Sequence, residues 1–225
     1  MNVAVLFAGG KDSTYAAHEA VSSGLKIKYL LTIISKNPHS WMFHTINIKT
    51  TRYQADAMGF EQYVRTSSGE KERELEDLKQ TIAAVRTNIG GIVSGGIASS
   101  YQKSRIDGIC KDLGLESITP LWGRDPHELL HDMRMAGFKI MITRVAAQGF
   151  NQSWLGREID ESAIDDLNRI SRKYGINPIG EGGEYESFVL DAPLFKKSIV
   201  PIEVETVWKG TNGDLLIKRV KMAKK

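Results

Sequence analysis

The chain has 225 residues, of which 41% are hydrophobic and 25% charged, with a formal net charge of +3. These proportions are those of a soluble globular protein with one large domain, or a main domain with a smaller appendage, and the weak charge gives no reason to expect DNA binding. One cysteine, no signal-peptide pattern and no apolar run of membrane-spanning length lead us to expect a cytoplasmic protein with no membrane partner.

The N-terminal stretch carries the first candidate site. An apolar run at Val3–Phe7 predicts a strand, a helix is expected from Thr14 to about Ser23, and Ala8-Gly9-Gly10-Lys11-Asp12-Ser13 joins the two. A strand, a glycine-rich turn and a helix present backbone N–H groups to a phosphate, because glycine has no Cβ to hold an anion away. The stretch therefore predicts a phosphate-binding loop.

Two residues of this loop add to the prediction. Lys11 supplies a cation, and we expect Asp12 or Ser13 to cap the helix. The loop is not a Walker P-loop, because Asp12 separates Lys11 from Ser13. The simpler alternative is a tight turn with a capping residue and no ligand.

Strands and helices alternate through the first half of the chain. This order predicts a Rossmann-like α/β fold with a parallel five-stranded sheet and helices on both faces. The expected strands are Val3–Phe7, Ile27–Ile34, Glu61–Arg65, Gly91–Val93 and Ser117–Thr119, and the expected helices are Thr14–Ser23, Asn47–Met58, Glu70–Thr87 and Ile97–Leu113.

A second glycine-rich loop, Ser94-Gly95-Gly96, follows the fourth expected strand. Ligands of parallel sheets bind at the carboxyl ends of the strands, where this loop, the first loop and the stretch Ser35–His44 would converge. Taken alone it is an ordinary turn, and paired with the first loop it forms a second wall of a nucleotide cleft. The helix after it carries further polar candidates, namely Ser99, Ser100, Tyr101, Gln102 and Arg105.

The second half of the chain differs in character. A turn-rich hinge at Pro120–Pro126 separates it from the first half, so we expect a larger α/β domain at 1–120 and a smaller C-terminal α+β lobe at 121–225. The lobe is predicted to contain helices His127–Ala136 and Asp160–Tyr174, and strands Lys139–Val145, Ser187–Leu190, Ile199–Val207 and Asp214–Val220.

Three carboxylates cluster around a Gly-Gly pair in this lobe. Glu181, Glu184 and Glu186 would repel one another in a plain turn, and a cation or an ammonium-bearing ligand would relieve that repulsion. The alternative is a solvated acidic loop. The alternation of glycines and carboxylates favours a functional site.

The remaining candidates are weaker. Trp122 is most simply a packing residue between the lobes and Asp125 a helix cap, although both could line a cleft. His44 ends a long loop and could reach a ligand, but the other histidines lack the spacing of a zinc site. Cys110 is expected to be a small core residue.

Several of these stretches together resemble one family. The first loop is similar to the SGGKDS signature of the N-type ATP pyrophosphatases, with Ala8 in place of the usual serine. The whole chain resembles the diphthine–ammonia ligases, especially the short archaeal form. The matching pieces are Gly9–Ser13, Ser40–His44, Gly96–Arg105, Pro120–Trp122 with Asp125, Leu155-Gly156 with Asp160, and Gly180–Glu186 followed by Phe188–Asp191.

The resemblance implies an adenine nucleotide alpha hydrolase-like fold and a reaction. The implied enzyme uses ATP and Mg²⁺ to adenylate diphthine, a modified histidine on translation elongation factor two. Ammonium then forms the amide, and AMP and pyrophosphate are released. The chain has no room for a glutaminase domain, so free ammonium is the expected nitrogen source. The sequence leaves open whether the protein forms a homodimer.

The resemblance also assigns residues. Those implied to hold ATP are Ala8, Gly9, Gly10, Lys11, Asp12, Ser13, Gly95 and Gly96, with Asp12 also a ligand of Mg²⁺. The implied catalytic residues are Lys11, Asp12, Glu184 and Glu186. Those implied to bind the substrate are His44, Ser100, Tyr101, Gln102, Arg105, Trp122, Asp125, Glu181, Gly182, Gly183, Glu184, Tyr185 and Glu186.

Two alternatives remain open from the sequence. The first is another ATP pyrophosphatase, such as a tRNA-thiolating enzyme, but such enzymes usually need more than one cysteine. The second is a sensor that holds ATP without turnover, which explains the glycine loops and leaves the carboxylate cluster at 181–186 unexplained. Release of AMP would separate them.

Overall fold

The computed structural model describes residues 1–37, 40, 43 and 45–225. Its first half contains the predicted sheet of five parallel strands, in the spatial order β3-β2-β1-β4-β5. The strands are β1 Asn2–Leu6, β2 Lys26–Ser35, β3 Glu61–Ser67, β4 Gly91–Val93 and β5 Glu116–Ile118. The predicted α/β class is confirmed.

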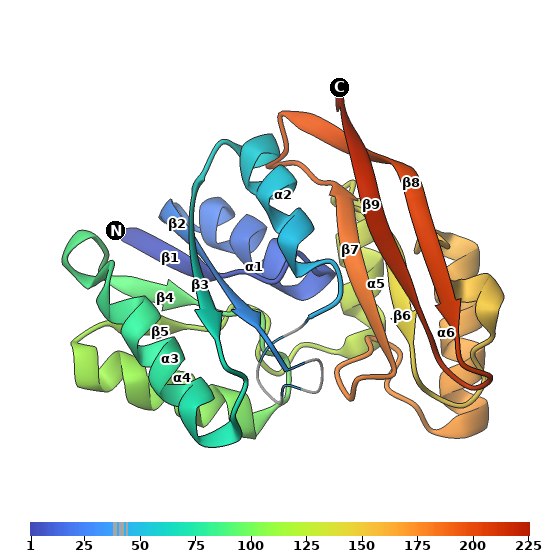
Figure 1. Cartoon of the computed structure of the whole chain (residues 1–225), viewed down its shortest axis with the longest axis horizontal. Helices are drawn as coiled ribbons and strands as arrows, with labels where there is room; N and C mark the ends of the chain where they lie inside the picture. The colour runs from blue at the N-terminus through green and yellow to red at the C-terminus, as the bar shows by residue number, and fades with distance from the viewer. Residues whose placement is uncertain (38–39, 41–42, 44) are drawn as a thin grey trace.

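Helices cover both faces of this sheet (Figure 1). They are α1 Lys11–Ser22, α2 Thr51–Met58, α3 Lys71–Ala83 and α4 Ser100–Leu113. Successive side chains of a strand point to opposite faces, so Val3 and Val5 of β1 pack in the core that contains residues of α1 and α2. Ala4 between them packs in the core of α3 and α4, which also holds Cys110.

Cys110 is the small core residue that the sequence predicts, with 1% of its surface exposed. Burial raises the pKa of its thiol to about 11. Because the thiolate is the reactive form of cysteine, this side chain is inert at neutral pH.

The second half forms an antiparallel sheet in the order β7-β6-β9-β8, with two helices against it (Figure 1). This confirms the predicted α+β lobe. Its strands are β6 Lys139–Val145, β7 Tyr185–Asp191, β8 Lys197–Trp208 and β9 Gly213–Lys224, and its helices are α5 Pro126–Met135 and α6 Glu161–Tyr174. Short 3-10 turns occur at Ile48–Thr50, Arg86–Asn88 and Gln152–Trp154.

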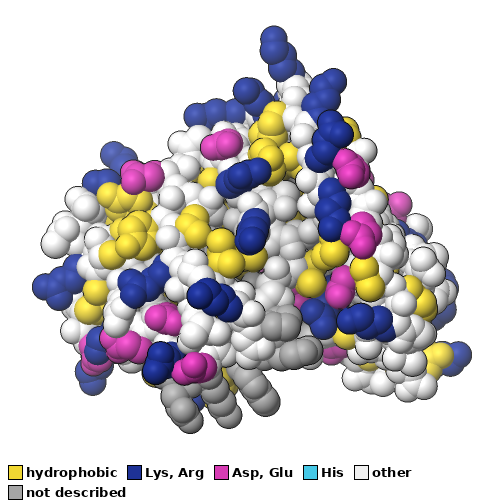
Figure 2. Space-filling model, viewed as in Figure 1, with side chains coloured by type: hydrophobic (Ala, Val, Ile, Leu, Met, Phe, Trp, Pro, Cys, Tyr) yellow, Lys and Arg dark blue, Asp and Glu magenta, His cyan; other side chains and the backbone are white. Residues whose placement is uncertain are grey.

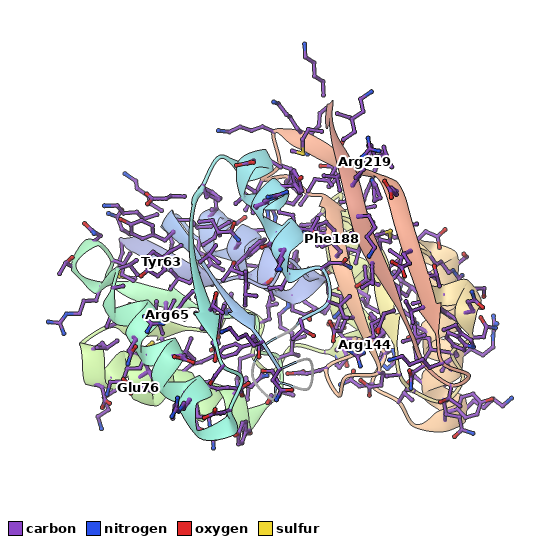
Figure 3. All side chains as sticks on the ribbon, viewed as in Figure 1. Tyr63, Arg65, Glu76, Arg144, Phe188 and Arg219 are labelled. Atoms are coloured by element: carbon purple, nitrogen blue, oxygen red, sulfur yellow. The ribbon has the colours of Figure 1, made fainter. Side chains whose placement is uncertain are left out.

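One apolar core joins the two halves. It contains Val5 of β1 and Ala16 of α1 together with Ile142 of β6 and Phe188 of β7. Phe188 is 2% exposed and lies between the two sheets (Figure 3). The lobe is therefore packed directly against the first sheet's helices rather than attached by a linker alone.

The first helix begins earlier than predicted. Gly9 has a φ of +76°, which turns the chain so that α1 starts at Lys11 with Gly10 as its N-cap. Our expectation that Asp12 or Ser13 caps this helix is wrong, because both lie inside its first turn and no side chain makes the cap hydrogen bond.

The fourth helix begins later than predicted. Residues 97–99 are not helical, and α4 starts at Ser100. Its N-cap is Ser99, whose Oγ accepts a hydrogen bond from Gln102 N at 3.4 Å. The backbone N–H groups of residues 97–99 are therefore not used inside the helix and can bind other groups.

In the described part of the chain, no helix is both long enough and apolar enough to cross a membrane.

Candidate active site

A cavity of about 280 Å³ lies at the carboxyl ends of β1 and β4, with walls from both halves of the chain. The first half contributes the two glycine loops, and the second half contributes the start of β7 and the loop before it. The lining from these segments consists of Ala8, Gly10, Lys11, Asp12, Ser13, Ser94, Gly95, Gly96, Ile97, Gly180, Glu181, Gly183, Tyr185, Glu186 and Ser187. The predicted convergence of the two glycine loops is therefore confirmed. Of the stretch Ser35–His44, Phe43 lines the cavity, and residues 38, 39, 41, 42 and 44 lie outside the described residues.

Strand β7 fixes the shape of the first glycine loop. Val189 N donates to Gly9 O at 3.1 Å, and Gln54 Nε2 donates to both Gly9 O and Val189 O at 2.8 Å. A Cβ at Gly9 would overlap Gln54 Oε1 and lie 2.8 Å from Thr51 Cγ2. Only glycine fits at this position, because both the positive φ and the close neighbours exclude a side chain.

Lys11 and Asp12 form an ion pair in the cavity wall. Lys11 Nζ lies 2.9 Å from Asp12 Oδ2 and 5.1 Å from the centroid of the Tyr185 ring, and the lysine is 3% exposed. Asp12 Oδ1 is buried and has no hydrogen-bond partner among the described residues. The wall thus holds one shielded cation and one carboxylate oxygen that has no hydrogen-bond partner among the described residues.

Tyr185 supports this pair as a neutral side chain. Burial raises the pKa of its phenol well above the ordinary value, and the charges of Asp12 and Glu184 raise it further. Its hydroxyl donates to Pro178 O at 3.0 Å. The ring therefore offers Lys11 an aromatic face rather than a negative charge.

Ser187 is a site residue that sequence reasoning missed. Its Oγ accepts a hydrogen bond from Lys11 N at 3.1 Å, so β7 contacts the first turn of α1 as well as the glycine loop. The signal that could have found it is its place directly after Glu186, at the start of a strand that follows the carboxylate cluster. Within the loop itself, Ser13 Oγ donates to Gly10 O at 3.2 Å and accepts from Ala8 N at 3.4 Å.

The second glycine loop packs against the first. A Cβ at Gly95 would lie 2.7 Å from the backbone carbon of Asp12, so glycine allows the two loops to touch. The N–H groups of the next residues converge on a carboxylate from the other half of the chain. Glu181 Oε1 accepts from Ile97 N at 3.0 Å, Ala98 N at 2.7 Å and Ser99 N at 3.0 Å.

The structure separates the three clustered carboxylates. Glu181 binds the second glycine loop, whereas Glu184 Oε1 accepts from Asn177 N at 2.9 Å and the residue lies outside the cavity lining. Glu186 lines the cavity, and its Oε1 is 3.8 Å from Arg144 Nη1. Mutual repulsion is reduced because each carboxylate has its own partner, backbone N–H groups for Glu181 and Glu184 and a guanidinium for Glu186.

Arg144 is a second residue that sequence reasoning missed. It lies on β6 (Figure 3), and its guanidinium contacts both Glu186, which lines the cavity, and Asp214. Its Nε lies 3.6 Å from Asp214 Oδ1. Only the antiparallel pairing of β6 with β7 and β9 brings these three residues together.

The helix after the second glycine loop contributes one predicted residue to the cavity. Gln102 is part of the lining, and Ser100, Tyr101 and Arg105 are not. Tyr101 and Arg105 stack on each other at the surface, with the guanidinium 3.3 Å from the ring centroid. Ser100 is exposed at the first position of α4.

The two hinge candidates also lie outside the cavity lining. Asp125 is the N-cap of α5 and accepts from His127 N at 2.8 Å and Glu128 N at 3.1 Å, so the capping interpretation is confirmed. Those two backbone N–H groups lower the pKa of its carboxyl. Trp122 is 37% exposed, with Lys103 Nζ 5.5 Å from its ring centroid. The prediction for His44 falls outside the described residues.

Apart from Gln102 and Lys103, the rest of the cavity lining is apolar. It consists of Leu6, Phe7, Leu31, Ile33, Phe43, Ile46, Ile48, Leu78 and Ile106. A ligand that fits both regions would carry an anionic end for the first glycine loop and a flat apolar part for this wall.

A protein-only metal site is absent from the described residues, which contain no group of three His, Cys, Asp or Glu side chains able to hold an ion. Asp12 Oδ1 is the one carboxylate oxygen in the first glycine loop that lacks a partner among those residues.

Comparison with known proteins gives a consistent result over both halves of the chain. Residues 1–117 match the family described as Diphthamide synthase N-terminal domain, and residues 125–223 match the Diphthamide synthase C-terminal domain. Proteins named diphthine–ammonia ligase from Danio rerio and Homo sapiens are each 35% identical to this chain over 92% of its length. The matched regions cover 89% and 85% of those proteins.

The yeast relatives are longer. A diphthine–ammonia ligase of Schizosaccharomyces pombe is 33% identical over 98% of this chain, and the match covers 39% of that protein. The chain therefore matches well under half of the length of this relative, whereas it matches most of the length of the animal proteins.

Proposed function

Because the chain belongs to the diphthamide synthase family, we propose that it is a ligase that forms a carbon–nitrogen bond. The proposed reaction amidates the carboxylate of diphthine on translation elongation factor two with ammonium. ATP is converted to AMP and pyrophosphate. The observation that carries the proposal is the cavity that is lined both by a glycine loop of the first half and by the segment 180–187 of the second half.

The first glycine loop is the proposed site of the ATP phosphates. It combines the N-terminus of α1, the buried ammonium of Lys11 and a glycine whose positive φ brings the backbone close to a ligand. The apolar wall next to it suits the adenine ring. Lys11 would stabilise negative charge as the diphthine carboxylate attacks the α-phosphate and pyrophosphate leaves.

Magnesium fits this proposal with one protein ligand. Mg²⁺ is commonly held by one or two carboxylates together with substrate phosphates and waters. The unpartnered Asp12 Oδ1 supplies such a carboxylate beside the loop. When bound, the ion would neutralise phosphate charge, and Lys11 holds the other oxygen of Asp12 in place.

Glu186 is the carboxylate we propose for contact with the diphthine side chain. It lines the cavity and is held near Arg144, opposite the loop that would carry ATP. A carboxylate at this position attracts the positively charged trimethylammonium of diphthine.

The test follows nucleotide products. Mg-ATP, ammonium and diphthine-bearing elongation factor are mixed with the enzyme and each is omitted in turn. We expect AMP and pyrophosphate in the full mixture, with a loss of about one mass unit on the factor as a hydroxyl is replaced by an amine. Lys11→Met keeps the buried stem and removes the charge, so it should lower AMP formation about 100-fold or more.

Lys218→Met is the matched control, because Lys218 pairs with Glu205 on the hairpin surface. It should form AMP at the wild-type rate. If AMP is formed without the elongation factor, the substrate is a different carboxylate or a tRNA. ATP that binds without any AMP would support a sensor instead of a ligase.

A further inference from the structure

The second glycine loop cannot act as a phosphate cradle while Glu181 occupies it. Its three convergent N–H groups, from Ile97, Ala98 and Ser99, all donate to Glu181 Oε1 at 2.7–3.0 Å. A phosphate placed there would have to displace a carboxylate that already satisfies these donors. The two glycine loops, similar in sequence, therefore present opposite chemistry to the cavity.

What the second loop offers instead is hydrogen-bond acceptors. Glu181 Oε2 is buried and has no partner among the described residues, and the same holds for Ser94 Oγ. Ser94 is 4% exposed, and both residues line the cavity. A buried carboxylate oxygen without a donor is costly, so a ligand that brings N–H donors and positive charge would be stabilised here.

In the described part of the chain, the cations that line the cavity do not fill this position. Two lysines line the cavity, and each pairs elsewhere: Lys11 Nζ with Asp12 at 2.9 Å, and Lys103 Nζ with Asp107 at 2.6 Å. The described residues also lack a group of carboxylates that would hold a divalent metal here.

We propose that Ser94 and Glu181 form the binding site for the ammonium ion. Ammonium is compact, carries one positive charge and has four N–H donors, which matches one anionic and one neutral acceptor. The trimethylammonium of diphthine has no N–H and cannot satisfy either atom. The inference rests on the proposed function, since it assigns the nitrogen donor of that reaction to the second glycine loop.

The kinetic test measures KM for ammonium and KM for ATP separately. Ser94→Ala removes one acceptor and should raise KM for ammonium about 10-fold, with KM for ATP unchanged. Glu181→Gln keeps a carbonyl oxygen for the loop but replaces the free oxygen with a donor, so its effect on KM for ammonium should be larger.

Two matched variants separate this site from general effects. Glu205 is a carboxylate of the β8–β9 hairpin that pairs with Lys218 at 2.7 Å and lies outside the lining, so Glu205→Gln should leave KM for ammonium unchanged. Ser171→Ala removes a hydroxyl that donates to Ile176 O far along α6, and it should change neither constant. An unchanged KM for ammonium in Ser94→Ala and Glu181→Gln would overturn the site.

A binding measurement distinguishes failure of the site from failure of the proposed function. Ammonium chloride should raise the melting temperature of the wild-type protein more than tetramethylammonium chloride at the same ionic strength, and Ser94→Ala should abolish the difference. If the wild type forms no AMP but shows this difference, the ligase proposal is wrong and the site stands. If the wild type forms AMP but has the same melting temperature in both salts, the proposed ammonium site is wrong and the ligase proposal stands.

Discussion

At the scale of single residues, backbone geometry explains the first glycine loop better than side-chain chemistry does. Gly9 has a positive φ and lies against Gln54 and Thr51, and its carbonyl receives two hydrogen bonds. The loop is therefore held from outside by α2 and β7. This explains how Ala8 can replace the usual serine of the signature: its backbone N–H, which donates to Ser13 Oγ, is unchanged by the substitution.

Gly9→Ala should abolish nucleotide binding. The added Cβ overlaps Gln54 Oε1, and left-handed backbone costs a non-glycine residue about 1–2 kcal/mol. The measurement is ATP affinity by calorimetry together with the free energy of unfolding. Gly210→Ala is the control, because Gly210 has a similar φ of +82° with no atom within 4 Å of its Cβ position. Wild-type ATP affinity in Gly9→Ala would contradict this account of the loop.

At the scale of secondary-structure elements, helix starts decide which polar residues reach the cavity. The late start of α4 leaves residues 97–99 outside the helix, so their N–H groups can bind Glu181. At the start of α5, by contrast, the carboxylate of Asp125 accepts hydrogen bonds from the helix's own first N–H groups. The carboxylate that binds the N–H groups before α4 thus comes from the distant Glu181, whereas the one at the start of α5 belongs to the helix's own N-cap, Asp125.

Asp125→Asn tests the capping role. The pKa of Asp125 is lowered in the folded protein, so its charge adds stability above the ordinary value of about 4, and this contribution is lost as pH falls through the lowered pKa. The asparagine oxygen still accepts the two cap hydrogen bonds, so the variant loses only the charge and should melt slightly below wild type at pH 7, with the gap closing below about pH 4. Its KM for each substrate should equal that of wild type. A raised KM for the protein substrate would instead support the substrate-binding hypothesis.

At the scale of the whole molecule, the two halves share one core, and positive charge is concentrated on the C-terminal hairpin. Residues 197–225 contain seven Lys and Arg and three Asp and Glu, a net charge of +4 in a chain of net +3. Figure 2 shows these basic side chains along the β8–β9 hairpin. The apolar core, by contrast, continues from β1 and α1 to β6 and β7, so we expect the halves to unfold together.

Phe188→Ala should destabilise both halves at once. The side chain is 2% exposed between the two sheets, and truncation of a buried phenylalanine costs about 3–5 kcal/mol. Denaturant unfolding followed by tryptophan fluorescence and by far-UV circular dichroism should give coincident curves with a lower midpoint. Val64→Ala, at a position that is 48% exposed, is the control and should have little effect. Two separate transitions would show that the halves fold independently.

The sequence alone determined the alternation of strands and helices, and with it the parallel sheet and the edge where its loops meet. It also determined both glycine loops and the carboxylate cluster, because these patterns are local: turns need glycine, and apolar periodicity follows the secondary structure. The smaller α+β lobe and the buried position of Cys110 followed from the same patterns.

Only the tertiary structure decided what each polar residue of the site contacts. Glu181, Glu184 and Glu186 are neighbours in sequence, yet their partners lie on the second glycine loop, at Asn177 and on β6. Ser187 and Arg144 joined the site through the pairing and docking of β7, which no local pattern records. The physical reason is that a buried carboxylate is stabilised by whichever donors the folded chain brings to it, and those donors come from segments far apart in sequence.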